Sequence, residues 1–278
     1  MSRIDSLSVL LDTTGKMLLS EAYAGVLENV QKTAISAQIK NTELSGDPTA
    51  GTVEAKRFAN SSSQAYGTAR GNGKGTQIKG KTVTIPIDTD REFIEEIEQK
   101  DISLLGVDGL IAKRSANHAM RLTAELDTKF FAVGKTEGTQ FTPSNVTAIQ
   151  DILEQAIVTM ETLKTDYIDG LDRSQMTAVL DPTTYSAMRT WLDTVTNTNV
   201  DTTSESFLAF HGVKVFSSNR LPAGTKFELM IDGSIAQPVR STPYSAERVP
   251  LSEAWAIEMF VYYGTKAVTP ETILYYAP

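Results

Sequence analysis

The chain has 278 residues, of which 41% are hydrophobic and 22% charged, as is usual for a protein with a sizeable buried core. Its net charge of -8 weighs against a protein whose main task is to bind nucleic acid, because neutralising phosphates requires a basic face. The absence of cysteine excludes disulfides, thiolate metal sites and cysteine nucleophiles. No apolar run approaches the roughly 20 residues that span a bilayer, and the N-terminal residues do not resemble a secretory signal. We therefore expect the protein to be synthesised in the cytoplasm and not to associate with membranes.

The N-terminal part of the sequence predicts an arm followed by a projecting loop. Residues 16–40 predict one or two helical stretches with a narrow apolar stripe, too thin to form a core of its own. Residues 41–52 are rich in turn formers. The alternating segments GTVEAKRF (51–58) and KTVTIPID (81–88) predict two strands. About twenty residues between them contain almost nothing apolar, so we expect this segment to project from the body.

Two longer helices are predicted next. The first covers residues 103–133, a rod of roughly 46 Å, and Gly134 is expected to be its C-terminal cap. Eight side chains define its buried face: Leu104, Val107, Ile111, His118, Leu122, Leu126, Phe130 and Val133. The second helix is predicted to begin at Thr142-Pro143, because proline suits the first turn of a helix, and to run to about residue 164.

Strands dominate the prediction for the C-terminal half. MTAVLD (176–181) is typical of a buried strand, and Asp181-Pro182 is expected to open a short helix. GVKVFSS (212–218) and KFELMID (226–232) predict two further strands joined by a turn. Alternating apolar residues from Trp255 to Tyr263 predict one long strand. The predicted fold class is α+β.

The stretch GTQIKGKT, residues 75–82, matches the P-loop pattern G-x-x-x-x-G-K-[ST]. A working P-loop needs a buried strand before the glycines and a helix immediately after them, because the helix N-terminus holds the phosphates. Here a polar loop precedes the glycines, and Lys81-Thr82 runs into a predicted strand that contains Pro86. We therefore interpret the match as accidental, with a P-loop nucleotide-binding enzyme as an alternative.

The titratable residues do not form a recognisable catalytic or metal site. His118, on the apolar stripe of the long helix, and His211, before a strand, are both expected to be hydrogen-bonded core or interface residues. Two histidines without cysteine leave zinc too few soft ligands. One acidic run lacks the calcium-binding glycine, since Phe93 occupies its place, and predicts a solvated face: Asp88, Asp90, Glu92, Glu95, Glu96 and Glu98. The acids of DYIDGLDR predict a turn. We expect no catalytic residue, no metal site and no enzyme activity.

Basic residues gather in and beside the projecting loop, with one aromatic residue among them: Arg57, Tyr66, Arg70, Lys74, Lys79 and Lys81. Single-stranded nucleic acid is held by several aromatic rings interleaved with such charges. An acidic surface on a neighbouring protein therefore fits this cluster better than DNA does.

The order of these parts resembles the major capsid proteins of tailed bacteriophages, which have the Hong Kong 97-like coat fold. Four stretches carry the resemblance, which extends over nearly the whole chain from about residue 50: KTVTIPIDTDREFIEEIEQKDI, AVLDPTTYSAMRTWL, GVKVFSSNRLPAG and AWAIEMFVYYGTKAVTPETILYY. It implies an N-terminal arm (1–46), an extended loop over an adjacent subunit (47–92), a peripheral domain with a spine helix (93–143 and 235–268) and an axial domain (144–234 and 269–278). The basic cluster would then be an inter-subunit contact.

The resemblance also implies a function and partners. The chain would be a structural protein without cofactors that self-assembles into hexamers and pentamers of an icosahedral shell enclosing double-stranded DNA. It would assemble in the host cytoplasm and belong to the virion, with DNA held by non-specific contacts. We expect a separate scaffolding protein, because an arm of about 46 residues is too short for the scaffolding segment of some relatives. Portal, decoration or tail proteins are further expected partners.

Some relatives join a loop lysine to a neighbour's asparagine with an assisting glutamate. Lys74, Lys79 or Lys81 could supply the lysine, but no asparagine or glutamate can be matched, so we predict no crosslink. Two structural alternatives stay open at this point. An encapsulin-like compartment would enclose protein cargo, and a tail or other virion protein would form tubes or rings.

Overall fold

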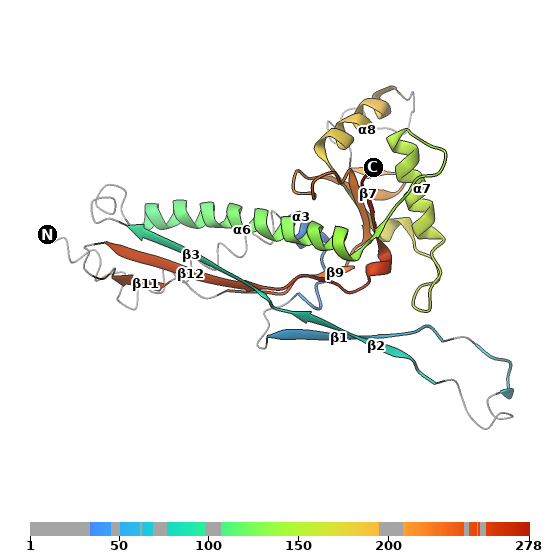
Figure 1. Cartoon of the computed structure of the whole chain (residues 1–278), viewed down its shortest axis with the longest axis horizontal. Helices are drawn as coiled ribbons and strands as arrows, with labels where there is room; N and C mark the ends of the chain where they lie inside the picture. Colours follow the sequence, from blue (N-terminus) through green and yellow to red (C-terminus); the bar gives the residue numbers. More distant parts are fainter. Residues whose placement is uncertain are drawn as a thin grey trace.

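The computed structural model describes residues 34–45, 51–61, 63–68, 77–97, 107–194, 208–241, 245–248, 250 and 254–278. The molecule is elongated: a long helix and long strands extend to one side, a helix-covered sheet forms the other end, and a two-stranded hairpin projects below (Figure 1). Helices and strands are mixed, which confirms the α+β class. Most of the helical arm predicted over residues 16–40 lies outside the described residues, and its end forms the short helix α3 (Ile35–Ile39).

The elongated side consists of one helix on one sheet. Helix α6 (Val107–Glu137) lies along a four-stranded antiparallel sheet (Figure 1). Its long strands β3 (Thr89–Ile97) and β12 (Trp255–Tyr263) pair along all nine residues, and β10 (Val239–Ser241) and β11 (Ser245–Arg248) pair with the other edge of β12. Met259, Val261 and Tyr263 alternate along β12 and are buried, as their spacing predicted.

The end of helix α6 differs from the prediction. Gly134 is not a cap, because the helix continues to Glu137 and is followed by Gly138. Gly134 instead lies close to the sheet: a Cβ at this position would collide with the buried carboxyl group of Glu228 on strand β8 (Phe227–Ile231), which would have to shift. The sequence drew attention to Gly134 as a helix terminator. The structure shows that the helix passes close to strand β8 at this residue and does not end there.

The other end of the molecule is a six-stranded sheet in the order β4-β14-β8-β5-β7-β6. Besides β8, it contains β4 (Thr139–Gln140), β5 (Met176–Leu180), β6 (Ala209–Phe210), β7 (Val213–Ser217) and β14 (Ile273–Tyr276). The helices α7 (Ile149–Glu161) and α8 (Pro182–Thr194) pack on it, and the 3₁₀ turns are η1 (Arg173–Gln175) and η2 (Pro270–Thr272). All five residues of β5 are buried, which confirms the predicted core strand.

One helix start was predicted correctly and another was not. Asp181 accepts a hydrogen bond from the Thr184 N–H at 3.0 Å, so helix α8 opens with an aspartate cap as expected. The helix predicted from Thr142-Pro143 begins six residues after Pro143, at Ile149. The backbone of Asn145 has a φ of 57°, which a right-handed helix does not allow, and Phe141 still bonds to the sheet through Tyr275.

The two ends are joined by a shared core and a buried polar cluster. Phe130 and Phe131 of α6 pack against Val179 and Met230 of the six-stranded sheet and against Ile39 of α3. Beside this core, the buried carboxylate of Asp127 accepts a long hydrogen bond from the Ile35 N–H (3.4 Å) and three shorter ones. The shorter ones come from the Ser36 N–H (3.0 Å), the Ser36 hydroxyl (2.6 Å) and Nη1 of Arg220 (2.7 Å). The described part of the arm is therefore tied to the long helix.

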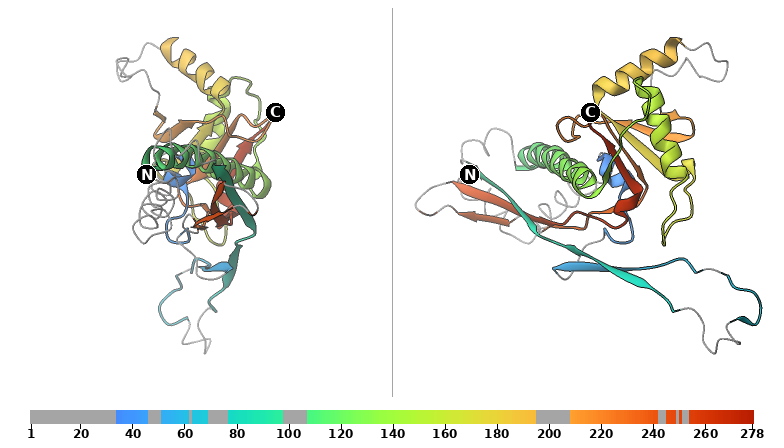
Figure 2. Two further views of the ribbon diagram at one scale, coloured as in Figure 1. Left: turned by 90° about the vertical axis from the view of Figure 1, so that its left-hand side faces the viewer. Right: turned by 45° about the vertical axis from the view of Figure 1, so that its right-hand side comes forward.

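The projecting hairpin is formed by β1 (Thr52–Phe58) and β2 (Gly80–Pro86), which pair in antiparallel register over seven residues. Both strands were predicted from their alternation. Ile85 is fully buried against Ala236 and Val268, which belong to or adjoin the small sheet of β9 (Ile235–Ala236) and β13 (Lys266–Ala267). The base of the hairpin is thus packed on the body, while its far end extends away (Figures 1 and 2).

Candidate interaction surface

The two faces of the hairpin carry different side chains because successive residues of a strand point to opposite sides. One face includes Val83 and Ile85, which are buried against the body. The opposite face holds Lys56 and Phe58, and the ring of Phe58 is 62% exposed. Ile78, just before β2, is 84% exposed. Large apolar side chains exposed on a projecting element indicate a surface that binds another protein.

Arg57 holds the hairpin against its own chain. Its Nη2 forms an ion pair with Glu271 at 2.5 Å, Nη1 donates to the Val268 carbonyl at 3.4 Å, and the guanidinium lies 4.6 Å above the ring of Tyr167. Burial alone would raise the pKa of Glu271. The hydrogen bond from Arg57 and the charges of Arg57 and Lys81 outweigh it, so the pKa lies below its ordinary value. Arg57 therefore anchors the hairpin within the chain.

Lys81 of β2 stands opposite Arg57 in register, and Lys79 and Tyr66 lie farther along the hairpin. Tyr66 is 98% exposed, and Lys79 and Lys81 are exposed as well. Arg70 and Lys74 lie outside the described residues. The role of this cluster in subunit contact stays a prediction. Three exposed residues were absent from it: Lys56, Phe58 and Ile78. Ile78 is an isolated apolar residue in a polar loop, and this signal could have identified it.

A turn from the other end of the molecule supports the outer part of the hairpin. The Asn60 N–H donates to the carbonyl of Asp166 at 2.8 Å, and a hollow of about 520 Å³ lies between the strand ends and residues 164–169. The turn predicted from DYIDGLDR is present: Lys164 pairs with Asp169, and Gly170 has a φ of 80°. The hairpin is thus held at its base and again at this turn.

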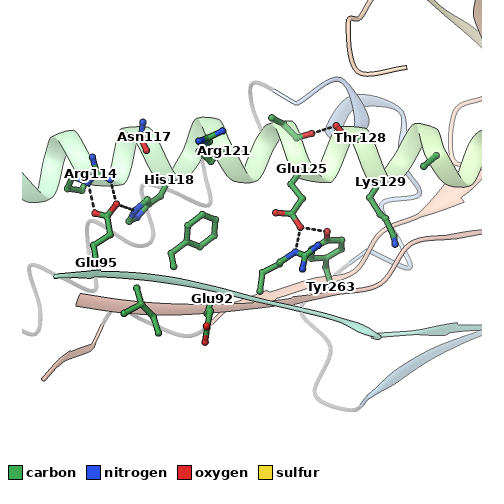
Figure 3. Close-up of a pocket in the computed structure, with 15 residues that line it drawn as sticks. Glu92, Glu95, Arg114, Asn117, His118, Arg121, Glu125, Thr128, Lys129 and Tyr263 are labelled. Atoms are coloured by element: carbon green, nitrogen blue, oxygen red, sulfur yellow. Dashed lines mark hydrogen bonds and ion pairs between the residues drawn. The ribbon is translucent and has the colours of Figure 1, made fainter. Parts of the chain in front are cut away.

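A groove of about 770 Å³ lies between helix α6 and strand β3 (Figure 3). Its charged side chains bridge helix and sheet. Glu95 pairs with Arg114 and lies 3.2 Å from Nε2 of His118, so this glutamate is not part of a solvated face as predicted. Glu125 pairs with Arg91 and accepts a hydrogen bond from Tyr263 at 2.8 Å.

His118 and Tyr263, which line this groove, are uncharged and contact glutamates of the helix and the sheet. Burial, with the nearby charge of Arg114, lowers the pKa of His118, so its ring is neutral at pH 7. Burial and the contact with Glu125 raise the pKa of Tyr263, whose hydroxyl therefore stays protonated. His118 is a buried histidine beside a polar partner, as predicted. The groove holds helix and sheet together, and its described residues show no arrangement of a nucleophile with a base.

His211 lies at the surface, which excludes the core alternative of its prediction and leaves the interface alternative as a prediction. It lies in the turn between β6 and β7 with a φ of 47°, and its side chain is about half exposed. Its Nδ1 lies 2.6 Å from Glu154, and its ring stacks on Phe210. The expected polar contact is present, but the side chain is not buried, because a tight turn places the residue at the surface.

Other site classes find no support in the described part of the chain. Lys81 and Thr82 lie within strand β2, so the helix that a P-loop requires does not follow them. Among these residues no cluster of three metal-ligating side chains occurs. Nor does any helix described here combine the length and apolar character needed to cross a membrane.

Comparison with known proteins adds an independent finding. A family model described as phage capsid protein matches residues 89–276, more than half of the chain. A search of curated proteins found no match.

Solved structures share the fold at low sequence identity. The capsid of cyanophage P-SCSP1u has a TM-score of 0.69 and 13% identity, with 88% of each chain covered. A chain of Mycobacterium phage Che8 has a TM-score of 0.59 and 15% identity, with 82% of this chain and 85% of its own covered. A virus-like particle from Pyrococcus furiosus has a TM-score of 0.55 and 11% identity, with coverages of 93% and 97%.

Proposed function

Because the chain belongs to the phage capsid protein family, we propose that it assembles with copies of itself into the hexamers and pentamers of an icosahedral shell around double-stranded DNA. The observation that carries this proposal is the family match over residues 89–276. That range extends from β3 to β14 and includes both the long helix with its sheet and the six-stranded sheet. The projecting hairpin, with exposed Phe58 and Ile78, supports contact with neighbouring copies.

The parts of the molecule then take distinct roles. Residues 1–46 would form an arm and residues 47–92 an extended loop over an adjacent subunit. Residues 93–143 with 235–268 would form the peripheral domain, and residues 144–234 with 269–278 the axial domain at the symmetry axes. Since β3 pairs along its whole length with β12, we place the start of the peripheral domain at Thr89 rather than at residue 93.

The protein would act as a structural component of the virion, assembled in the host cytoplasm, without catalysis or a cofactor. We propose a separate scaffolding protein, a portal and decoration or tail proteins as further partners. Packaged DNA would meet the shell through non-specific contacts, and the net charge of -8 would keep it loosely held by repulsion.

Electron microscopy of the purified chain tests this proposal. The expected result is closed shells, or curved but aberrant shells when a scaffolding partner is missing. A chain that stays monomeric under every assembly condition would refute it. Tubes or rings would indicate another virion component, and native particles with protein cargo instead of nucleic acid would indicate a storage compartment. Denaturing electrophoresis of mature particles should show single chains, because no crosslinking partner for a loop lysine was found.

A further inference from the structure

Glu228 is a buried titratable side chain for which the proposed assembly has no use. It lies on strand β8, and its carboxyl group is fully buried. Neither carboxyl oxygen has a hydrogen-bond partner among the described residues. Buried polar groups in folded proteins are nearly always hydrogen-bonded, so this exception indicates a group with a role other than ordinary packing.

The carboxyl group of Glu228 lies between the six-stranded sheet and the end of helix α6. Tyr275 of β14 and Val179 of β5 stand beside Glu228 in register, on the face of the sheet that α6 covers. From the helix, the backbone of Gly134 approaches so closely that a Cβ there would collide with the carboxyl group. The neighbouring strands offer Glu228 no cation, and the helix lies directly over it.

The cations near this contact are engaged elsewhere. Lys135 of α6 acts on Glu228 through its charge, but its Nζ donates to the Ala223 carbonyl at 3.0 Å. Lys226, two residues before Glu228, lies 3.6 Å from Asp181. Burial therefore raises the pKa of Glu228 well above its ordinary value, and Lys135 opposes this only in part.

The two sides of the contact are held with different firmness. Strand β8 is hydrogen-bonded along one edge to β14 and along the other to β5. The last turn of α6 is joined to the body by single side-chain hydrogen bonds, from Lys135 to Ala223 and from the Ala267 N–H to Glu137 at 3.0 Å. Helix ends open at a lower free energy than central strands. Water would therefore reach Glu228 by separation of the helix end from the sheet.

We propose that Glu228 is a proton-controlled latch between helix α6 and the six-stranded sheet. With the proton bound, the last turn of the helix lies on β8. Loss of the proton lifts this turn, because an unpaired carboxylate is strongly disfavoured in an apolar interior and becomes hydrated when the helix end separates.

The latch lies where the two ends of the molecule meet (Figure 1). Helix α6 runs from its own antiparallel sheet to the six-stranded sheet, so the contact at Glu228 helps to set how the two ends are joined. In the proposed shell these ends would be the peripheral and axial domains, and the angle between them would depend on pH. This consequence rests on the proposed function, whereas the latch itself does not.

Amide hydrogen exchange of the unassembled full chain between pH 5 and pH 9 tests the latch, after correction for the intrinsic exchange rates. The protection of residues 134–137 should fall about tenfold per pH unit until the pKa of the latched carboxyl group is reached, since opening releases one proton. Glu228→Gln should remove this dependence. Glu228→Met is a second variant that does not ionise, should the glutamine variant fail to fold. Glu96→Gln, at an exposed position of β3, is the control and should behave like the wild type.

Low concentrations of urea distinguish the latch from global unfolding, because urea acts in proportion to the surface that opening exposes. Exchange at residues 134–137 should hardly change with urea below the unfolding transition, whereas exchange in β5 should accelerate. The inference is overturned if the helix end shows the same urea dependence as β5, if its protection does not vary with pH, or if the variants at Glu228 keep the variation. A chain that forms no shells would instead count against the proposed function, since the exchange measurement does not need assembly.

Discussion

The burial of Glu228 between helix α6 and the six-stranded sheet can be tested through the pH dependence of the free energy of unfolding. Its carboxyl group is fully buried beside Gly134, and neither oxygen has a hydrogen-bond partner among the described residues. Burial raises the pKa of Glu228 well above its ordinary value, and the charge of Lys135 opposes this only in part. The folded protein therefore holds a proton on Glu228 at pH values where the unfolded chain, with a carboxyl pKa of about 4.3, has released it.

The sign and size of the pH dependence follow directly. Above the unfolded pKa, the folded state binds more protons than the unfolded state, so the free energy of unfolding falls as the pH rises. The contribution of one such group is about 1.4 kcal/mol per pH unit until the folded pKa is reached. Glu228→Gln, which is similar in size and does not ionise, should remove this contribution.

The measurement is urea denaturation of the unassembled wild type and of Glu228→Gln at intervals between pH 5 and pH 8. Because other carboxyl groups are common to both proteins, the difference between their unfolding free energies isolates Glu228. We expect that difference to change in favour of the variant by about 1.4 kcal/mol per pH unit over part of this range. Glu92→Gln, at an exposed position, is the control and should show a flat difference. A flat difference for Glu228→Gln would contradict the unpartnered, protonated carboxyl group described above.

Three further substitutions test the packing contacts. Arg57→Ala should lower the protection of the hairpin amides in hydrogen exchange by about 1.5–3 kcal/mol, whereas equal protection would show that the contacts with Glu271 and Tyr167 do not anchor it. Gly134→Ala should lower the melting temperature, because a collision costing about 1–3 kcal/mol outweighs the gain in helix propensity of about 1 kcal/mol, and a raised melting temperature would contradict this. Asp127→Ala should reduce the free energy of unfolding by about 3–5 kcal/mol, since Arg220 loses its buried partner. A loss below about 1 kcal/mol in urea denaturation would indicate a solvated pair instead.

Patterns confined to one segment predicted most of the elements. The alternation from Trp255 to Tyr263 and the apolar spacing along α6 were sufficient because helix and strand periods depend only on local backbone geometry. The helix start at Asp181-Pro182 was predicted for the same reason, since the aspartate accepts a hydrogen bond from an amide only three residues away. The order of these elements along the chain was also enough to indicate the capsid family, which the family match over residues 89–276 confirms.

The sequence by itself therefore determined the elements, since each follows from neighbouring residues. Their order along the chain then indicated the family. Only the tertiary structure decided what the individual side chains do. It showed that Gly134 makes room for Glu228, that Glu95 pairs with the helix, and that Arg57 faces the body while Phe58 faces outward. These contacts depend on partners tens to hundreds of residues away in the sequence. A local sequence pattern cannot predict which distant residue a side chain will contact once the chain has folded.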